Sequence, residues 1–83
     1  MKKIKNKKGA KIKISDVLQM AIKAHQSGKI TDAMTLYQTI LAIEPNQADA
    51  LHYLGMAQHQ LGNKEEAIVL IKRAIDNAPD YVD

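Results

Sequence analysis

The sequence predicts an all-α fold in which two helix–turn–helix units stack on each other. Three observations indicate this fold. Apolar residues recur at helical spacing, glycine and proline interrupt these stripes at regular places, and the chain aligns with itself after a shift of 34 residues. Repetition at this period is typical of a stacked solenoid rather than of a closed globule.

The repeat is clearest at positions where the two copies carry the same residue. Apolar character is also kept where the residues differ, as at Met20 and Leu54. The identical pairs include His25 and His59, Gln26 and Gln60, Gly28 and Gly62, Ala33 and Ala67, Leu36 and Leu70, Pro45 and Pro79, and Asp49 and Asp83. Because the two halves of the sequence align in one register, we expect each half to form the same structural unit.

The first unit has polar residues at its start and breakers at its turn and at its end. Ser15 and Asp16 supply the polar start of a helix. Gly28 ends that helix because glycine readily adopts the left-handed conformation, and Pro45 ends the next because proline cannot continue a helix. The two expected helices cover residues 15–27 and 30–44.

The third helix is expected over residues 47–61. Asn46, followed three residues later by Asp49, resembles a capping box with a shorter acid, and Gly62 ends the helix. Gly55 inside this helix costs about 1 kcal/mol relative to alanine, so it needs a packing reason. We expect close contact between two helices at Gly55.

The fourth helix is expected over residues 64–77. Asn63 is placed to cap it, and Glu66 stands three residues later, where it can bond back to the cap. Pro79 then prevents its continuation.

Composition limits the kind of core and the chemistry available to the chain. At 83 residues it is one small domain, which buries only roughly 60% of its unfolded surface. Phe and Trp are absent, so the core is expected to be aliphatic. The absence of Cys removes disulfides and thiolate metal sites and fits a reducing compartment, so we expect a cytoplasmic protein.

The net charge of +3 hides a basic leader and an acidic remainder. Residues 1–15 carry seven Lys and no acid, whereas the other 68 residues carry five basic and nine acidic side chains. The default interpretation is a disordered leader over residues 1–13. Weak attachment to nucleic acid or anionic lipid, and packing of Ile12 and Ile14 on a neighbouring apolar face, are the alternatives. No apolar run follows the lysines, so a secretory signal is not expected, and no stretch approaches a membrane span.

The framework of the two units resembles the tetratricopeptide repeat. In the second unit the family positions fall on Leu51, Leu54-Gly55, Ala67, Ile71, Ala74 and Pro79, and in the first unit on Val17, Met20-Ala21, Ala33, Tyr37, Ile40 and Pro45. Trp is missing, Ile40 replaces a small residue, and Ala24 or Gln58 stands where an aromatic is expected. The resemblance implies a short right-handed solenoid over residues 14–81, with repeats at about 14–47 and 48–81. Residues 82–83 then begin a third repeat.

The resemblance also implies a scaffold that binds partner peptides in a concave groove lined by the first helix of each repeat. The expected partner-binding residues are Leu18, Ile22, His25, Gln26, Asp49, His52, Met56, His59 and Gln60. About half are apolar or weakly polar, which favours an extended peptide or a helix in a mixed groove. The Lys and Asn with which one subclass grips a terminal carboxylate are replaced here by Leu18, Ile22, His52 and Met56. Gln19 and Tyr53 occupy the places of the Asn ladder that another subclass carries.

Two other functions remain open. The chain is similar to the leading repeats of long bacterial tetratricopeptide proteins, so it is alternatively the N-terminal substrate-recruiting part of a longer glycosyltransferase-like enzyme. The stretch AIVLI at residues 67–71 is apolar on more faces than one neighbouring helix covers. Self-association as a homodimer through Ile68, Ile71 and Ile75 of the last helix is the other alternative.

Catalysis and metal binding are not expected from the chain itself. His52 and His59 are seven residues apart, which is not the i, i+4 spacing that favours metal ligation on a helix. Glu65, Glu66 and Asp76 fall at a helix end or on a polar face, where a solvated charge is the ordinary outcome. Aromatic residues do not alternate with the basic ones, so no specific nucleic-acid binding is predicted, and no cofactor is expected.

Overall fold

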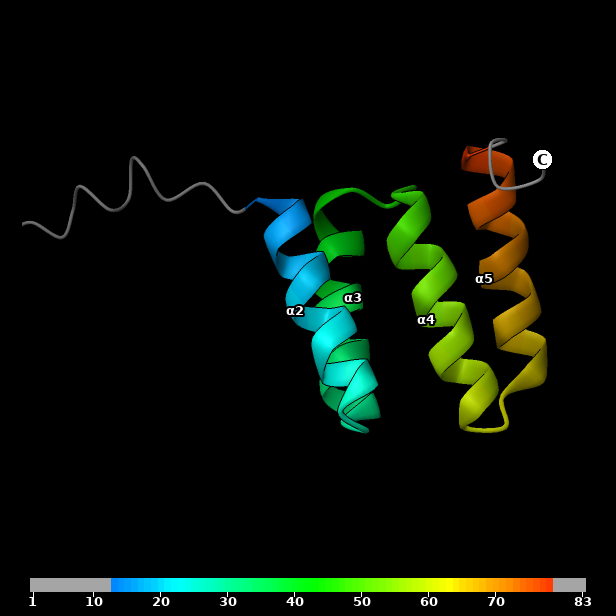
Figure 1. Ribbon diagram of the computed structural model, residues 1–83. Helices are drawn as coiled ribbons and strands as arrows, with labels where there is room; N and C mark the ends of the chain where they lie inside the picture. The colour runs from blue at the N-terminus through cyan, green and yellow to red at the C-terminus, as the bar shows by residue number, and fades with distance from the viewer. Residues whose placement is uncertain (1–12, 79–83) are drawn as a thin grey trace, which may run out of the picture.

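Two helical hairpins, placed side by side, make up the residues that the computed structural model describes, 13–78 (Figure 1). The helices are α2 (Ile14–Gln26), α3 (Ile30–Ile43), α4 (Ala48–Gln60) and α5 (Lys64–Asn77). Each helix end lies within one residue of its expected place, and residues 13–78 contain no strand, so the all-α prediction is confirmed. The basic leader, the closing Pro79 and the start of a third repeat lie outside the described residues, and the domain boundaries stay predictions.

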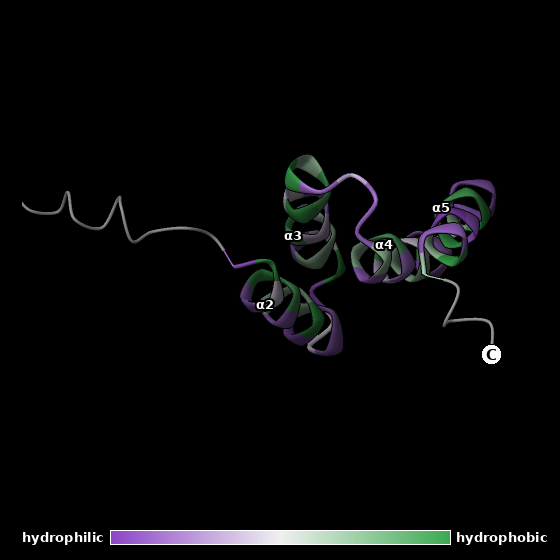
Figure 2. Ribbon diagram, turned by 90° about the horizontal axis from the view of Figure 1, so that it is seen from above, coloured by the Kyte–Doolittle hydropathy of each residue, from purple (hydrophilic) through white to green (hydrophobic). Residues whose placement is uncertain are grey.

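The four helices follow a zigzag course. Seen from above, α2 and α4 lie towards one side of the molecule and α3 and α5 towards the other (Figure 2). Helix α2 packs on α3 and α4 on α5, whereas the two hairpins meet mainly through α3 and α4. Helices α2 and α4, the first of each hairpin, therefore share one face of the molecule.

The turns inside the hairpins depend on the two predicted glycines. Gly28 and Gly62 have φ angles of 84° and 89°, in the left-handed region that residues with a Cβ rarely adopt. In both turns the backbone folds back on the preceding helix. The N–H of Lys29 donates to the carbonyl of Ala24, and the N–H of Asn63 donates to that of Gln58, each at 2.9 Å. The predicted helix stops are confirmed.

The start of α4 corrects the sequence prediction by one residue. Gln47, not Asn46, is the N-cap, and its side-chain Oε1 accepts a hydrogen bond from the backbone N–H of Ala50 at 2.8 Å. The helix begins at Ala48, so the residue before it occupies the capping position. The longer glutamine side chain satisfies a free N–H of the first turn there.

The predicted capping box of α5 is also wrong. Asn63 does occupy the N-cap, but its side chain makes no bond to the helix that follows. Its Nδ2 instead donates to Oε1 of Gln58 at 2.7 Å, back across the turn. Asn63 therefore ties the turn to α4 rather than capping α5.

The buried core is thin and rich in alanine. Alanine makes up more than half of the eleven buried apolar residues, and small side chains let helices approach closely. These residues are Ala21, Ala33, Tyr37, Ile40, Ala50, Leu51, Leu54, Ala57, Ala67, Leu70 and Ala74. Tyr37, Ile40 and Leu51 are the largest fully buried side chains, so an aromatic ring stands in a core that is otherwise aliphatic.

Gly55 marks the closest approach of α4 and α5. A Cβ at this position would lie 2.7 Å from Cγ1 of Ile71 and 3.2 Å from the carbonyl oxygen of Ala67. Both distances are shorter than ordinary van der Waals contact, so α5 occupies the space that any larger residue needs. The packing reason predicted for this glycine is confirmed.

Replacing Gly55 with alanine is expected to lower the free energy of unfolding by about 1–3 kcal/mol, because the new methyl group overpacks the contact with Ile71. Chemical denaturation followed by circular dichroism measures this loss. In an Ile71→Ala background the loss is expected to be smaller, since the contact with Cγ1 is gone and alanine favours the helix by about 1 kcal/mol, although the carbonyl oxygen of Ala67 still lies 3.2 Å from the new Cβ. Equal losses in the two backgrounds would contradict the assigned contact.

Candidate partner-binding face

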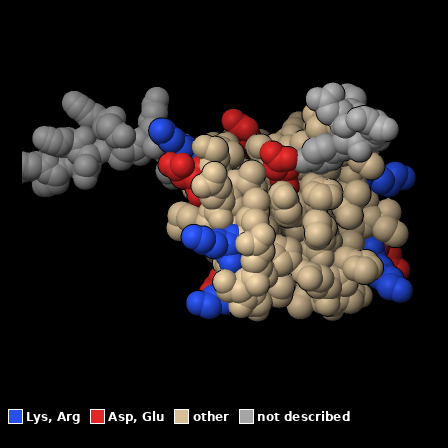
Figure 3. Space-filling view, in the orientation of Figure 1, with Lys and Arg blue, Asp and Glu red and all other residues tan. Residues whose placement is uncertain are grey.

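The face shared by α2 and α4 has an uncharged centre. In the orientation of Figure 1, α2 lies in front of α3, so this is the face turned towards the reader in the space-filling view. Figure 3 shows Lys, Arg, Asp and Glu around its margin and other residues across its middle. The middle of this face therefore exposes few charged side chains.

A cavity of about 290 Å³ opens on this face between the two repeats. Five of the nine predicted partner-binding residues meet in its lining, three from α2 and two from α4, together with two tyrosines. The lining residues are Ile22, His25, Gln26, Tyr37, Tyr53, Met56 and Gln60. Residues from both repeats thus converge on one concave site.

His25 links three helices at this cavity. Its Nε2 pairs with the side-chain Oε1 of Gln60 on α4, and its Nδ1 lies 3.0 Å from the hydroxyl oxygen of Tyr37 on α3. An amide oxygen only accepts hydrogen bonds, so Nε2 carries the proton and donates it. In the neutral imidazole Nδ1 then accepts from the hydroxyl of Tyr37. Both ring nitrogens are therefore engaged inside the protein.

Tyr37 lines the cavity from α3. Its ring is fully buried and stacks on that of Tyr53, with centroids 5.9 Å apart and planes inclined by 10°. The His25 ring meets the same ring edge-on, with centroids also 5.9 Å apart. Burial, and secondarily the neighbouring Tyr53, raises the pKa of the Tyr37 hydroxyl to about 12, because the phenolate would lose its hydration.

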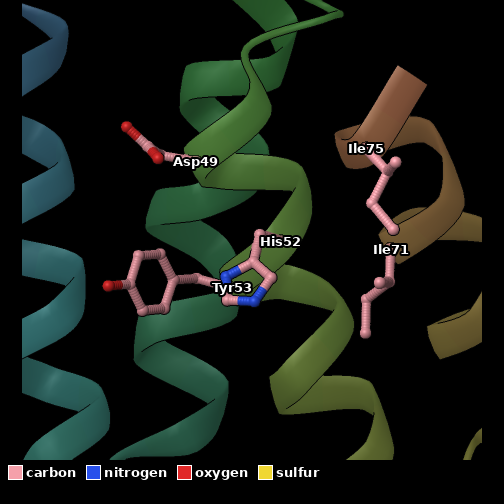
Figure 4. Close-up of a pocket in the computed structure, with 5 residues that line it drawn as sticks. All are labelled: Asp49, His52, Tyr53, Ile71 and Ile75. Carbon is pink, nitrogen blue, oxygen red and sulfur yellow. The ribbon is translucent and has the colours of Figure 1, made fainter. Parts of the chain in front are cut away.

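A second cavity, of about 440 Å³, lies between α4 and α5. Asp49, His52 and Tyr53 project from α4, and Ile71 and Ile75 from α5 (Figure 4). Two predicted partner-binding residues and two predicted self-association residues therefore share one hollow, although the sequence assigned them to separate sites.

The remaining predicted residues lie outside both cavities. Leu18 is half-buried and packs against the core, and His59 is exposed. Of the self-association residues, Ile68 is exposed, whereas Ile71 is half-buried against Gly55.

Tyr53 is the lining residue that the sequence analysis missed, and Tyr37 was assigned to the core alone. A signal for Tyr53 was present, because it lies four residues after Asp49 and three before Met56. That spacing places it on the same helix face as both.

No group of three or more His, Asp or Glu that could hold a metal ion occurs among residues 13–78. The same residues include no helix with the length and apolar character needed to cross a lipid bilayer.

The stacked hairpins and the shared concave face define a helical-repeat module. A model of the tetratricopeptide repeat family matches residues 24–83, which is most of the chain. The chain therefore belongs to the tetratricopeptide repeat family, as its two in-register copies predicted. Tetratricopeptide repeats generally mediate protein–protein interaction and are typically not enzymes. No curated protein matches the sequence.

The pH dependence of stability is expected to report on Tyr37. Because folding raises its pKa from about 10 to about 12, its contribution is complete below about pH 10 and is lost as the pH rises towards 12. Tyr37→Phe should remove the part of the stability loss at alkaline pH that comes from this hydroxyl. Near neutral pH the same replacement should lower the free energy of unfolding by about 0.5–1.5 kcal/mol, because the hydrogen bond to His25 is lost. Denaturation curves of both proteins across this range make the comparison. Identical alkaline losses would show that Tyr37 is not the responsible group.

Proposed function

We propose that the chain is a protein–protein interaction scaffold whose face on α2 and α4 binds a peptide or helical segment of a partner. The observation that carries this proposal is the convergence of both repeats on the 290 Å³ cavity. Concave sites lined mainly by apolar and aromatic side chains, with a few polar groups, are the usual form of a binding pocket. A cavity at the junction of two repeats also exists only when both are folded and stacked.

Rigid positioning of the lining supports the same function. His25 and Gln60 are 35 residues apart and bond to each other, and the two stacked tyrosines come from different repeats. A lining fixed by contacts within the protein loses little freedom on binding, which favours affinity. The alternative of a recruiting arm in a longer glycosyltransferase-like enzyme is compatible with such a face, but the family match concerns the repeat alone.

A matched pair of methionine variants tests the location of the site. Met56 lines the cavity and is 41% exposed, whereas Met20 is 58% exposed on α2 beside Asp16 and Lys23, away from the cavity. Met56→Lys is expected to weaken partner capture at least tenfold, since a cation in an apolar anchor site costs more than about 1.4 kcal/mol. Met20→Lys is expected to leave capture unchanged.

Capture is measured by quantitative mass spectrometry of proteins retained from a lysate of the source organism, with circular dichroism as the check on folding. A partner retained equally by both variants would place the binding surface elsewhere.

A second candidate function, self-association through α5, is favoured by comparing the two repeats. On α3 the stripe Met34, Tyr37 and Leu41 is buried or half-buried and packs in the core that α4 covers. The equivalent α5 residues include Ile68 and Ile75, which remain 59% and 36% exposed. The outer side of α2 instead presents Asp16, Gln19 and Lys23, which are exposed and polar.

The two ends of the stack therefore differ in kind. The α2 end exposes a single large apolar side chain, Met20, among these polar residues, so head-to-tail stacking of copies would place the α5 isoleucines mostly against polar groups. We propose that two copies meet with their α5 helices facing each other, since a symmetric contact pairs each apolar stripe with another.

Adjacent residues of α5 provide the test of self-association. Ile68→Lys is expected to convert a dimer into a monomer in light scattering, because it places a charge within the apolar stripe. Val69 is 52% exposed and lies about 100° further around the helix, so Val69→Lys should leave the dimer intact. A wild-type protein that stays monomeric at high concentration would contradict this second function.

A further inference from the structure

The cavity between α2 and α4 has no carboxylate, ammonium or guanidinium group in its lining. Its lining contains no Asp, Glu, Lys or Arg, although charged residues surround the same face (Figure 3). We propose that this cavity receives one uncharged apolar side chain of an extended peptide, and that the amides of Gln26 and Gln60 hold the peptide backbone beside it. This inference rests on the proposed function and specifies the chemistry of the partner.

The interior of the cavity matches an apolar anchor. The stacked rings of Tyr37 and Tyr53 form one wall, and Ile22 and Met56 supply aliphatic surface from the two repeats. The flexible thioether of Met56 can adapt to anchors of different shape. The volume of about 290 Å³ falls at the lower limit of roughly 300–1,000 Å³ for ligand sites, which suits a single side chain.

The polar groups of Tyr37 and His25 inside the cavity already have hydrogen-bond partners within the protein. The hydroxyl of Tyr37 and both ring nitrogens of His25 take part in the hydrogen bonds that join α2, α3 and α4. An ionised side chain of the partner would lose its hydration there without gaining an oppositely charged residue, at a cost of several kcal/mol. A carboxylate, phosphate or ammonium group is therefore disfavoured.

The free hydrogen-bonding capacity lies at the rim. The Gln60 oxygen pairs with His25, which leaves its amide NH₂ to donate, and the Gln26 amide makes no hydrogen bond within residues 13–78. Neutral amides complement peptide N–H and C=O groups. Those groups are free in an extended segment but are paired within a helix, so these two glutamines favour an extended backbone.

A library of random dodecapeptides displayed on phage and selected on the full chain tests this inference. The selected peptides are expected to share one Leu, Ile, Met or Phe anchor. Replacing that anchor with Ala should weaken binding at least tenfold, and replacing it with Asp or Lys should abolish binding. Raising the ionic strength should change the dissociation constant less than about twofold, since no ion pair contributes.

Variants of the chain locate the contact. Gln26→Ala is expected to weaken binding of the selected peptides about three- to tenfold, as for the loss of one hydrogen bond, and it leaves the pair between His25 and Gln60 intact. Gln38→Ala, on an exposed position of α3 that lines none of the described cavities, is the matched control and should have no effect.

The outcomes separate this inference from the proposed function. Peptides that need Met56 but depend on a charged side chain, a terminal carboxylate or a helical bound form overturn the inference and leave the binding face in place. Peptides that bind Met56→Lys as tightly as the wild type overturn both, as does a selection that yields no binding peptide.

Discussion

The burial of one aromatic ring holds the two repeats together. Tyr37 is the only aromatic residue in the buried core of residues 13–78, and it contacts a ring from each neighbouring first helix, His25 on α2 and Tyr53 on α4. Its hydroxyl group is satisfied by His25, which in turn pairs with Gln60 of the second repeat. Met34 and Leu41 of α3 pack against the same core cluster, which also contains Leu51 and Leu54 of α4. The same ring therefore lines the cavity and contacts both repeats.

Local sequence patterns were sufficient to predict the helices. The left-handed turns need glycine at positions 28 and 62, and the close contact of α4 with α5 needs glycine at position 55. Each of these features can be inferred from one glycine and its place in the repeat. The 34-residue repeat then placed the four helices in two equivalent hairpins.

The details that could not be predicted depend on contacts across turns or between repeats. Gln47 caps α4 because the helix begins one residue later than the pattern of Asn46 and Asp49 indicates. Asn63 bonds back to Gln58, and nothing in the local sequence distinguishes that bond from a cap. The role of Tyr53 arises only when α3 of the first repeat lies against it. Sequence periodicity identifies the face of a helix but not the side chain that meets it from another unit.

The unlike ends of the stack give the module a direction. Polar Asp16, Gln19 and Lys23 surround the exposed Met20 on the outer side of α2, whereas the isoleucines of α5 make the other end of the described stack suited to apolar contact. A designer who wished to lengthen the array would therefore graft new hairpins after α5 and keep α2 as the terminal unit. Growth in the opposite direction would first require the polar surface of α2 to be rebuilt with residues such as those at Ala50, Tyr53 and Ala57 of α4.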